Sequence, residues 1–492
     1  MSEPDNPFEM DEETFRALGH KMIDQIADFI SNVEDWPAAP DIAPENVHDI
    51  LPVQTLPEHG MSSDDLISEA IKLVIGNSRI NAHPKSWGYI IGSPAPIGIL
   101  GDLLASAINP NLAAWDSAPV ATEIELQTVS WIAELIGYPS NCGGIFTSGG
   151  NMANIVGFLA ARRRMGGSNL RQNGVGKLQQ RILYATRETH TWIEKAADIS
   201  GMGTDSIHWI DTDNEQRMDL DHLRDRLEED KDNLFKPYLL VGSAGTVSTG
   251  SIDPLVEMAE ISKQNNMWFH VDGAYGGFAA SSSKDVPEDI YGLREADSIA
   301  IDAHKWMFAP LEAGVALVRD KQVMLDTFSF DPPYYHNRNN KQVTHFHQYG
   351  PQNSRCFRAL KAWLILRQAG RSGYVATLDH NIELAKIMHE AMIAAPEIEA
   401  FTRRLSINTF RYVPEHGLPK DRKEREVYLN DLNTRLLTAV QRGGEAHISN
   451  AIVKGKFLLR TCITNFRTRE SDVRSLPEII VRTGHGLHGE IG

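Results

Sequence analysis

The sequence of 492 residues contains few cysteines and no long apolar run. Its three cysteines, Cys142, Cys356 and Cys462, are odd in number and far apart, which fits neither a disulfide framework nor a zinc-binding pattern. No stretch approaches the roughly 20 consecutive apolar residues that span a bilayer. The acidic N-terminus, MSEPDNPFEMDEE, is unlike a signal or transit peptide. We therefore expect a cytoplasmic protein without a membrane partner.

Basic residues are also in short supply. The chain has 48 lysines and arginines against 65 aspartates and glutamates, a net charge of −17. Because such a field repels phosphate groups, it argues against a nucleic-acid or anionic-membrane partner. The composition, 42% hydrophobic and 23% charged, is typical of a globular protein. The length suits a large catalytic domain with smaller flanking ones.

The first 110 residues are predicted to form a helical arm. Apolar residues at helical spacing predict a first helix over 11–34, and 64–109 is also helical apart from the segment 87–96. An apolar helical face with little to pack against is often buried on a partner subunit. We therefore expect residues 1–110 to pack on a second copy in a homodimer.

Residues 111–395 are predicted to form a large α/β domain. Short apolar strands are expected between helices, at 181–185, 238–241, 268–271, 298–301 and 314–318. This alternation is typical of a mostly parallel central sheet covered by helices on both faces. Residues 396–492 are predicted to form a small C-terminal α+β domain with a frayed tail.

Distinctive residues end two neighbouring strands, at the edge where ligands bind in open α/β sheets. Asp272 ends the strand in WFHVDGAYGG, where a carboxylate can keep a pyridine nitrogen protonated and Ala274 leaves space for a flat ring. His304 and Lys305 end the strand in SIAIDAHKW. An amine where water is scarce has a lowered pKa and becomes a nucleophile for a carbonyl. Alone, a turn-capping aspartate and a surface lysine would explain both motifs.

Two further features complete a pattern. Gly149 and Gly150, in GGIFTSGGNMAN, precede a predicted helix whose free backbone N–H groups can hold a phosphate. His190 follows the strand at 181–185 and can stack on a ring. Each is weak alone, but a phosphate cradle, a stacking histidine, a strand-end carboxylate and a strand-end lysine are the contacts that pyridoxal 5′-phosphate needs. We expect Lys305 to hold this cofactor as a Schiff base.

The motifs HVDGAYGG and DAHKW resemble those of the group II pyridoxal-phosphate-dependent amino-acid decarboxylases, which include aromatic-L-amino-acid and glutamate decarboxylases. The resemblance covers about residues 15–473, is supported by the run NPN…APVATEIE at 109–125, and looks closest to aromatic-L-amino-acid decarboxylase. It implies the α/β fold of fold-type I pyridoxal-phosphate enzymes, with a mostly parallel central sheet and a small C-terminal α+β domain. It also implies a homodimer.

The resemblance assigns roles to individual residues. The implied cofactor-binding residues are Lys305, Asp272, Ala274, Thr246, Gly149, Gly150, Asn151, His190 and His304. Among them, Asp272 would pair with the pyridine nitrogen, and His304 would lie beside the phosphate or the substrate. Tyr334 matches the mobile-loop tyrosine that supplies a proton during catalysis, although its neighbour Tyr335 leaves that register open. Asp302 departs from animal relatives, which usually carry asparagine there.

The implied reaction is decarboxylation of an L-amino acid to an amine and CO₂. Apolar segments favour an aromatic side chain such as that of tryptophan, tyrosine or dopa. The expected pocket residues are Trp87, Ile90, Asn111 and Ala113. The chief alternative substrate is glutamate or 2,4-diaminobutyrate. An acidic substrate would need an arginine in the pocket, but Arg355 and Arg358 match positions that aromatic-substrate enzymes also carry.

Other classes of protein are less well supported. An aldehyde-forming enzyme is an alternative, but such enzymes tend to replace either the equivalent of His190 or the loop tyrosine. A nucleotide-binding protein would carry GxGxxG after an early strand, a spacing that the glycine turn lacks. The pair His345 and His347 has no carboxylate or cysteine partner in the sequence pattern, so no metal is expected.

Overall fold

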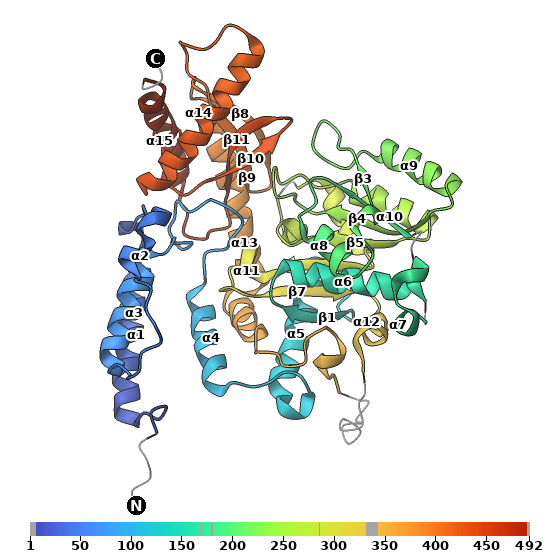
Figure 1. Cartoon of the computed structure of the whole chain (residues 1–492), viewed down its shortest axis with the longest axis horizontal. Coiled ribbons are helices and arrows are strands. Elements are labelled where there is room, and N and C mark those ends of the chain that lie inside the picture. Colours follow the sequence, from blue (N-terminus) through green and yellow to red (C-terminus); the bar gives the residue numbers. More distant parts are fainter. Residues whose placement is uncertain (1–5, 168, 179–180, 285, 331–342, 490–492) are drawn as a thin grey trace, which may run out of the picture.

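A seven-stranded sheet forms the centre of the larger part of the chain, in a computed structural model that describes residues 6–167, 169–178, 181–284, 286–330 and 343–489 (Figure 1). Its order is β1-β7-β6-β5-β4-β2-β3. The strands are β1 Gly143–Thr147, β2 Arg181–Thr186, β3 Ile207–Ile210, β4 Lys236–Ser243, β5 Trp268–Asp272, β6 Ser298–Asp302 and β7 Gly314–Val318. The strands from β6 through β3 pair in parallel, while β7 is antiparallel to both of its neighbours. The predicted mostly parallel sheet is confirmed.

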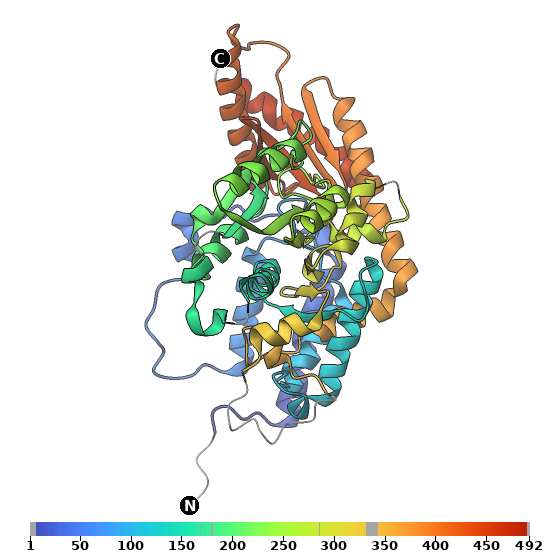
Figure 2. The ribbon, with the colours of Figure 1, turned by 90° about the vertical axis from the view of Figure 1, so that its right-hand side faces the viewer.

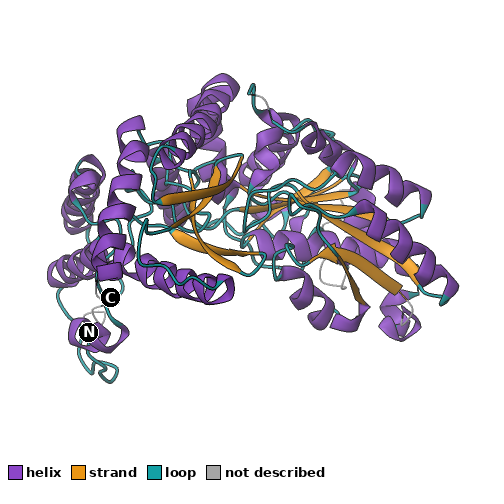
Figure 3. Cartoon of the chain, turned by 90° about the horizontal axis from the view of Figure 1, so that it is seen from above, coloured by secondary structure: helices purple, strands orange, loops and turns teal. Residues whose placement is uncertain are grey.

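Helices cover both faces of this sheet (Figure 3). The helices of this part of the chain are α5 Pro119–Leu135, α6 Gly150–Gly166, α7 Leu170–Asn173, α8 Trp192–Ile199, α9 Leu220–Asp232, α10 Leu255–Gln264, α11 Ala303–Trp306 and α12 Lys321–Phe328. Side chains of a strand alternate between the two faces. In β4, Leu240 joins one buried cluster, whereas Leu239 and Val241 join another. Both faces are therefore apolar, which explains the near-continuous hydrophobic strands.

A smaller antiparallel sheet, of order β10-β11-β9-β8, lies at the C-terminal end of the molecule (Figures 1 and 2). Its elements are β8 Ile398–Arg404, β9 Ile407–Tyr412, α14 Arg422–Gly443, β10 Ser449–Val453, β11 Lys456–Cys462 and α15 Glu470–Gly489. The long helix α13, Ala359–Ile393, contacts both parts of the chain. The prediction of a frayed tail is wrong. Helix α15 continues to Gly489, because His485 contacts Glu397 and His488 contacts the Tyr428 hydroxyl.

The N-terminal helices are α1 Glu12–Ser31, α2 Val47–Ile50, α3 Ser63–Asn77 and α4 Pro96–Ile108. Helices α1 and α3 lie side by side at one edge of the molecule, and neither has a buried residue (Figure 1). The segment 87–95 instead runs inward. The backbone N–H of Gly92 donates to the His304 carbonyl oxygen at 3.1 Å, which brings this segment to the DAHKW motif. No described helix combines the length and apolarity that crossing a bilayer requires.

Acid is expected to destabilise the small sheet region through His447. This side chain is buried, and burial, aided by Arg79, lowers its pKa to about 3. An unfolded histidine titrates near pH ~6.5. As the pH falls below that value, the unfolded chain takes up a proton that the folded chain refuses, so stability is lost. At pH ~5.5 the loss should be about 1 kcal/mol.

Urea unfolding at pH ~7.5 and ~5.5 tests this expectation. The fall in stability between the two values should be about 1 kcal/mol smaller in His447→Leu than in the wild type. His20→Leu, which removes an exposed histidine, is the control. An equal fall in the wild type and His447→Leu would contradict the expectation.

Candidate active site

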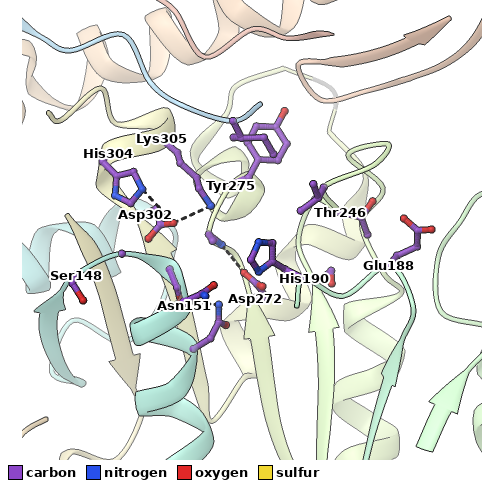
Figure 4. Close-up of a pocket in the computed structure, with 18 residues that line it drawn as sticks. Ser148, Asn151, Glu188, His190, Thr246, Asp272, Tyr275, Asp302, His304 and Lys305 are labelled. Carbon is purple, nitrogen blue, oxygen red and sulfur yellow. Dashed lines mark hydrogen bonds and ion pairs between the residues drawn. The ribbon is translucent and has the colours of Figure 1, made fainter. Parts of the chain in front are cut away.

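The C-terminal ends of β2, β4, β5 and β6 open into a cavity of about 350 Å³ (Figure 4). That volume lies at the small end of the range for ligand sites, roughly 300–1,000 Å³. The cavity collects these residues expected from the sequence: Ile90, Gly149, Gly150, Asn151, His190, Thr246, Asp272, Ala274, His304 and Lys305. Their convergence follows from the parallel pairing, because equivalent ends of parallel strands meet at one edge of the sheet.

Lys305 enters the cavity from α11, the short helix directly after β6. Its Nζ lies 2.9 Å from Asp302 Oδ2 (Figure 4). Burial lowers the pKa of Lys305, but the carboxylates of Asp302 and Asp272 raise it by more, so the net pKa lies above the ordinary value. The expectation of a lowered pKa is therefore wrong, because the two nearby anions outweigh the loss of water around the amine.

Asp272, at the end of β5, is held by two N–H donors. The backbone N–H of Ala274 donates to Oδ1 at 3.1 Å, and the indole Nε1–H of Trp192 donates to Oδ2 at 2.8 Å. Trp192 was not among the predicted site residues. Its contact spans 80 positions of sequence, and a tryptophan at a helix start gives no local sign of where its indole points.

The glycine turn lies at the N-terminus of α6. Gly149 is the N-cap with a φ of 106°, and no side chain caps the helix, so the first backbone N–H groups are free to face the cavity. A Cβ at Gly150 would lie 2.5 Å from Asp302 Oδ2, so only glycine allows this turn to approach β6 so closely. A helix N-terminus with unused donors is a suitable site for an anion such as a phosphate.

Three further side chains expected from the sequence also line the cavity. His190 lies near Asp272 at the mouth, where desolvation, partly offset by Asp272, lowers its pKa (Figure 4). His304 Nδ1 accepts from the backbone N–H of Ala313 at 3.1 Å, and burial likewise lowers its pKa. Thr246 is buried, and its Oγ1 accepts from the backbone N–H of Ser251 at 3.2 Å.

Several predicted pocket residues do not line this cavity. Trp87 is fully buried in the small-sheet core, where its indole donates to Thr468 Oγ1 at 3.2 Å. Asn111 Oδ1 accepts from the backbone N–H of Ala113, and Ala113 is held by His347 through its carbonyl oxygen. Tyr334 and Tyr335 lie outside the described residues.

The two arginines considered as partners for an acidic substrate, Arg355 and Arg358, are engaged elsewhere. Arg355 is buried against Glu125, and Arg358 bonds to Glu312 Oε1 through Nε at 2.9 Å and Nη2 at 2.7 Å. Neither lines the cavity. The part of the chain that the structure describes also contains no group of three or more His, Cys, Asp or Glu side chains suited to a metal ion.

The lining fits pyridoxal phosphate chemically. The free N–H groups of α6 suit the phosphate, the fixed carboxylate of Asp272 suits a pyridine nitrogen, and the small side chain of Ala274 leaves room for a flat ring. Asp302 Oδ1 is buried without a hydrogen-bond partner in the described chain. Such an atom is costly unless a ligand or a proton satisfies it. Lys305 supplies the amine.

Comparisons with known proteins agree with this chemistry. The model of the pyridoxal-dependent decarboxylase conserved domain matches residues 44–412. An aromatic-L-amino-acid decarboxylase of Bacillus atrophaeus is 29% identical over 464 residues, 94% of this chain and 93% of the relative. A phenylacetaldehyde synthase of Arabidopsis thaliana is 28% identical over 482 residues, 96% of each chain. The crystal structure of Catharanthus roseus tryptophan decarboxylase in complex with L-tryptophan matches with a TM-score of 0.86 and 25% identity, covering 97% of this chain and 100% of that one.

Proposed function

Because the chain belongs to the pyridoxal-dependent decarboxylase family, we propose that it converts an aromatic L-amino acid into the corresponding amine and CO₂. The chain is a pyridoxal-phosphate-dependent amino-acid decarboxylase. The observation that carries the proposal is that Lys305 and Asp272, from neighbouring strand ends, share one cavity with the free N-terminus of α6.

When bound, pyridoxal phosphate supplies a carbonyl group that links to an amine and a ring that accepts the electron pair left by departing CO₂. Lys305 Nζ would hold the cofactor and would give way to the substrate amine. The Lys305 amine reacts only in its neutral form, and Asp302 Oδ2, 2.9 Å from Nζ, stabilises and holds its protonated form. Asp272 keeps the ring nitrogen protonated. The backbone N–H groups after Gly149 hold the phosphate, with Asn151 and His304 beside it.

His190, Ala274 and Thr246 line the same cavity and would orient the ring when it is bound. A proton must replace CO₂ at Cα. By the family resemblance the hydroxyl of Tyr334, or of its neighbour Tyr335, delivers it.

An aromatic substrate is favoured over an acidic one for two reasons. The relatives at 28–29% identity are named for an aromatic amino-acid substrate or an aromatic product. In addition, Arg355 and Arg358 are bound to Glu125 and Glu312, so neither is available for a second carboxylate. Purified enzyme should turn over tryptophan, tyrosine or dopa with kcat/KM at least about tenfold above that for glutamate or 2,4-diaminobutyrate. Preferred turnover of glutamate would contradict the proposal.

The product separates decarboxylation from its close alternative. The relatives at 28–29% identity include both an amine-forming decarboxylase and an aldehyde synthase. The presence of His190 at the cavity favours the amine. Amine and CO₂ should form in equal amounts without hydrogen peroxide. Aldehyde and peroxide in amounts that match the CO₂ would make the chain an aldehyde-forming enzyme.

We also propose a cytoplasmic homodimer in which residues 1–110 pack on the partner, beside a large domain at 111–395 and a small one at 396–492. Support comes from α4, whose Leu100, Leu103, Leu104 and Ile108 are all exposed in the single chain. Isolated soluble chains rarely expose such a patch. Sedimentation equilibrium should give twice the mass of the 54.8 kDa chain, and a monomer at micromolar concentration would contradict the dimer.

A further inference from the structure

The indole of Trp192 is the feature that the proposed reaction leaves unexplained. Its Nε1–H donates to Asp272 Oδ2, the carboxylate expected to face the pyridine nitrogen. Trp192 is fully buried and does not line the cavity, so it cannot touch the substrate or the cofactor directly. We propose that Trp192 is a positioning residue, which fixes the carboxylate of Asp272 in the plane that the pyridine nitrogen requires. This inference rests on the proposed function.

The position of Trp192 in the chain makes it suited to this task. The connection after β2 carries His190 to the cavity and, two residues later, begins α8 with Trp192. One short segment therefore supplies both His190, expected to stack on the ring, and Trp192, which holds the carboxylate expected to face the ring nitrogen. A shift of this segment would move both together.

Packing holds the indole in place. Trp192 stands edge-on to His270, with ring centroids 5.4 Å apart and planes at 77°. His270 and Asp272 are two residues apart on β5, so their side chains share a face of the sheet. His270 is itself held by Asn154 Oδ1 and Ser298 Oγ, each at 2.7 Å. The donor to Asp272 is thus attached to a rigid, buried cluster.

Two donors on different oxygens restrict a carboxylate more than one does. With the Ala274 N–H on Oδ1 alone, the group could rotate about Cβ–Cγ. With the Trp192 N–H on Oδ2 as well, its plane is set. Removing a residue that orients a ligand-binding side chain without touching the ligand typically lowers affinity or activity about 10–100-fold. The loss should appear in kcat and in cofactor binding, because the substrate itself does not reach Trp192.

The test compares Trp192→Phe with Trp268→Phe. Trp268 is also a buried tryptophan of the same cluster, but its indole donates to Ser298 Oγ at 2.8 Å and not to Asp272. Apoprotein of each variant is titrated with pyridoxal phosphate, the visible band of the loaded protein is followed against pH, and kcat and KM are measured separately. For Trp192→Phe we expect the Kd of pyridoxal phosphate to rise and kcat to fall, each about tenfold, with KM within about twofold. Its visible band should titrate at a shifted pH, and Trp268→Phe should match the wild type.

The outcomes separate this inference from the proposed function. If wild-type apoprotein does not bind pyridoxal phosphate, the proposed function itself fails. If the wild type binds it, and Trp192→Phe keeps the wild-type Kd and spectrum, or Trp268→Phe changes as much, the positioning role is overturned. Should Trp192→Phe not fold, 3-benzothienylalanine at position 192 replaces the N–H by sulfur with the ring shape kept. The same shifts in that protein support the inference, and wild-type values overturn it.

Discussion

Lys305→Ala should lose at least about 1,000-fold in kcat, because no other lysine of the described residues lines the cavity to hold the cofactor covalently. Borohydride reduction of the loaded wild type, followed by digestion, should attach the reduced cofactor to the peptide that contains Lys305. The same treatment of the variant should leave all peptides unmodified. Attachment at a different lysine in the wild type would show that the catalytic lysine has been misassigned.

The Lys305 substitution also leaves Asp302 without its ion-pair partner. The Asp302 side chain is 1% exposed, and an uncompensated buried carboxylate is strongly unfavourable. Lys305→Ala should therefore unfold more easily than the wild type, and adding Asp302→Asn should restore most of the stability. Activity should stay lost in the double variant. A small primary amine such as methylamine, which can take the vacated place of Nζ, should recover part of the activity of Lys305→Ala. If the double variant regained activity without any added amine, the reaction would need the charge of Lys305 and not its amine.

Much of the site was predictable because its residues lie in short sequence motifs that follow predicted strands. Asp272 ends one apolar strand and Lys305 lies just after the end of the next, and a parallel sheet brings such ends together. The same reasoning found the long helices and the strands β2, β4, β5, β6 and β7, whose apolar runs are distinct. It did not find β1, β3, β8 or β10. Strand β1, GGIFT, lies inside a glycine-rich stretch that also resembles a turn, and β3 has only four residues.

What the sequence could not predict depends on contacts between distant residues. The pKa of Lys305 is raised by carboxylates whose distances are set by the fold, and Trp192 reaches Asp272 across 80 positions. Trp87 has an apolar neighbourhood in sequence, yet it packs in the core of the small sheet. The partner of Arg355, Glu125, is 230 positions away in sequence, so the sequence alone does not reveal this buried ion pair.

Arg355→Met is expected to destabilise the folded chain by about 3–5 kcal/mol, since it leaves Glu125 charged and buried without a partner. Both side chains are fully buried, and Arg355 Nη2 also donates to the Phe146 carbonyl oxygen at 2.8 Å. Glu125 Oε1 accepts from the backbone N–H of Phe146 at 2.9 Å. The pair therefore joins α5 to β1, the strand that leads into the glycine turn of the active site.

Matched variants separate the charge from the packing. Glu125→Gln alone leaves Arg355 unpaired and should destabilise by a similar amount, whereas Arg355→Met combined with Glu125→Gln should recover more than half of the loss. Urea unfolding at neutral pH measures each difference. Arg358→Met is the control, because its partner Glu312 is 44% exposed and water can replace the arginine, so we expect a change of less than about 1 kcal/mol. If Arg355→Met were as stable as the control but lost selectivity for an aromatic amino acid, Arg355 would have to be reassigned from the core to the substrate, and the preference for an aromatic substrate would lose one of its two supports.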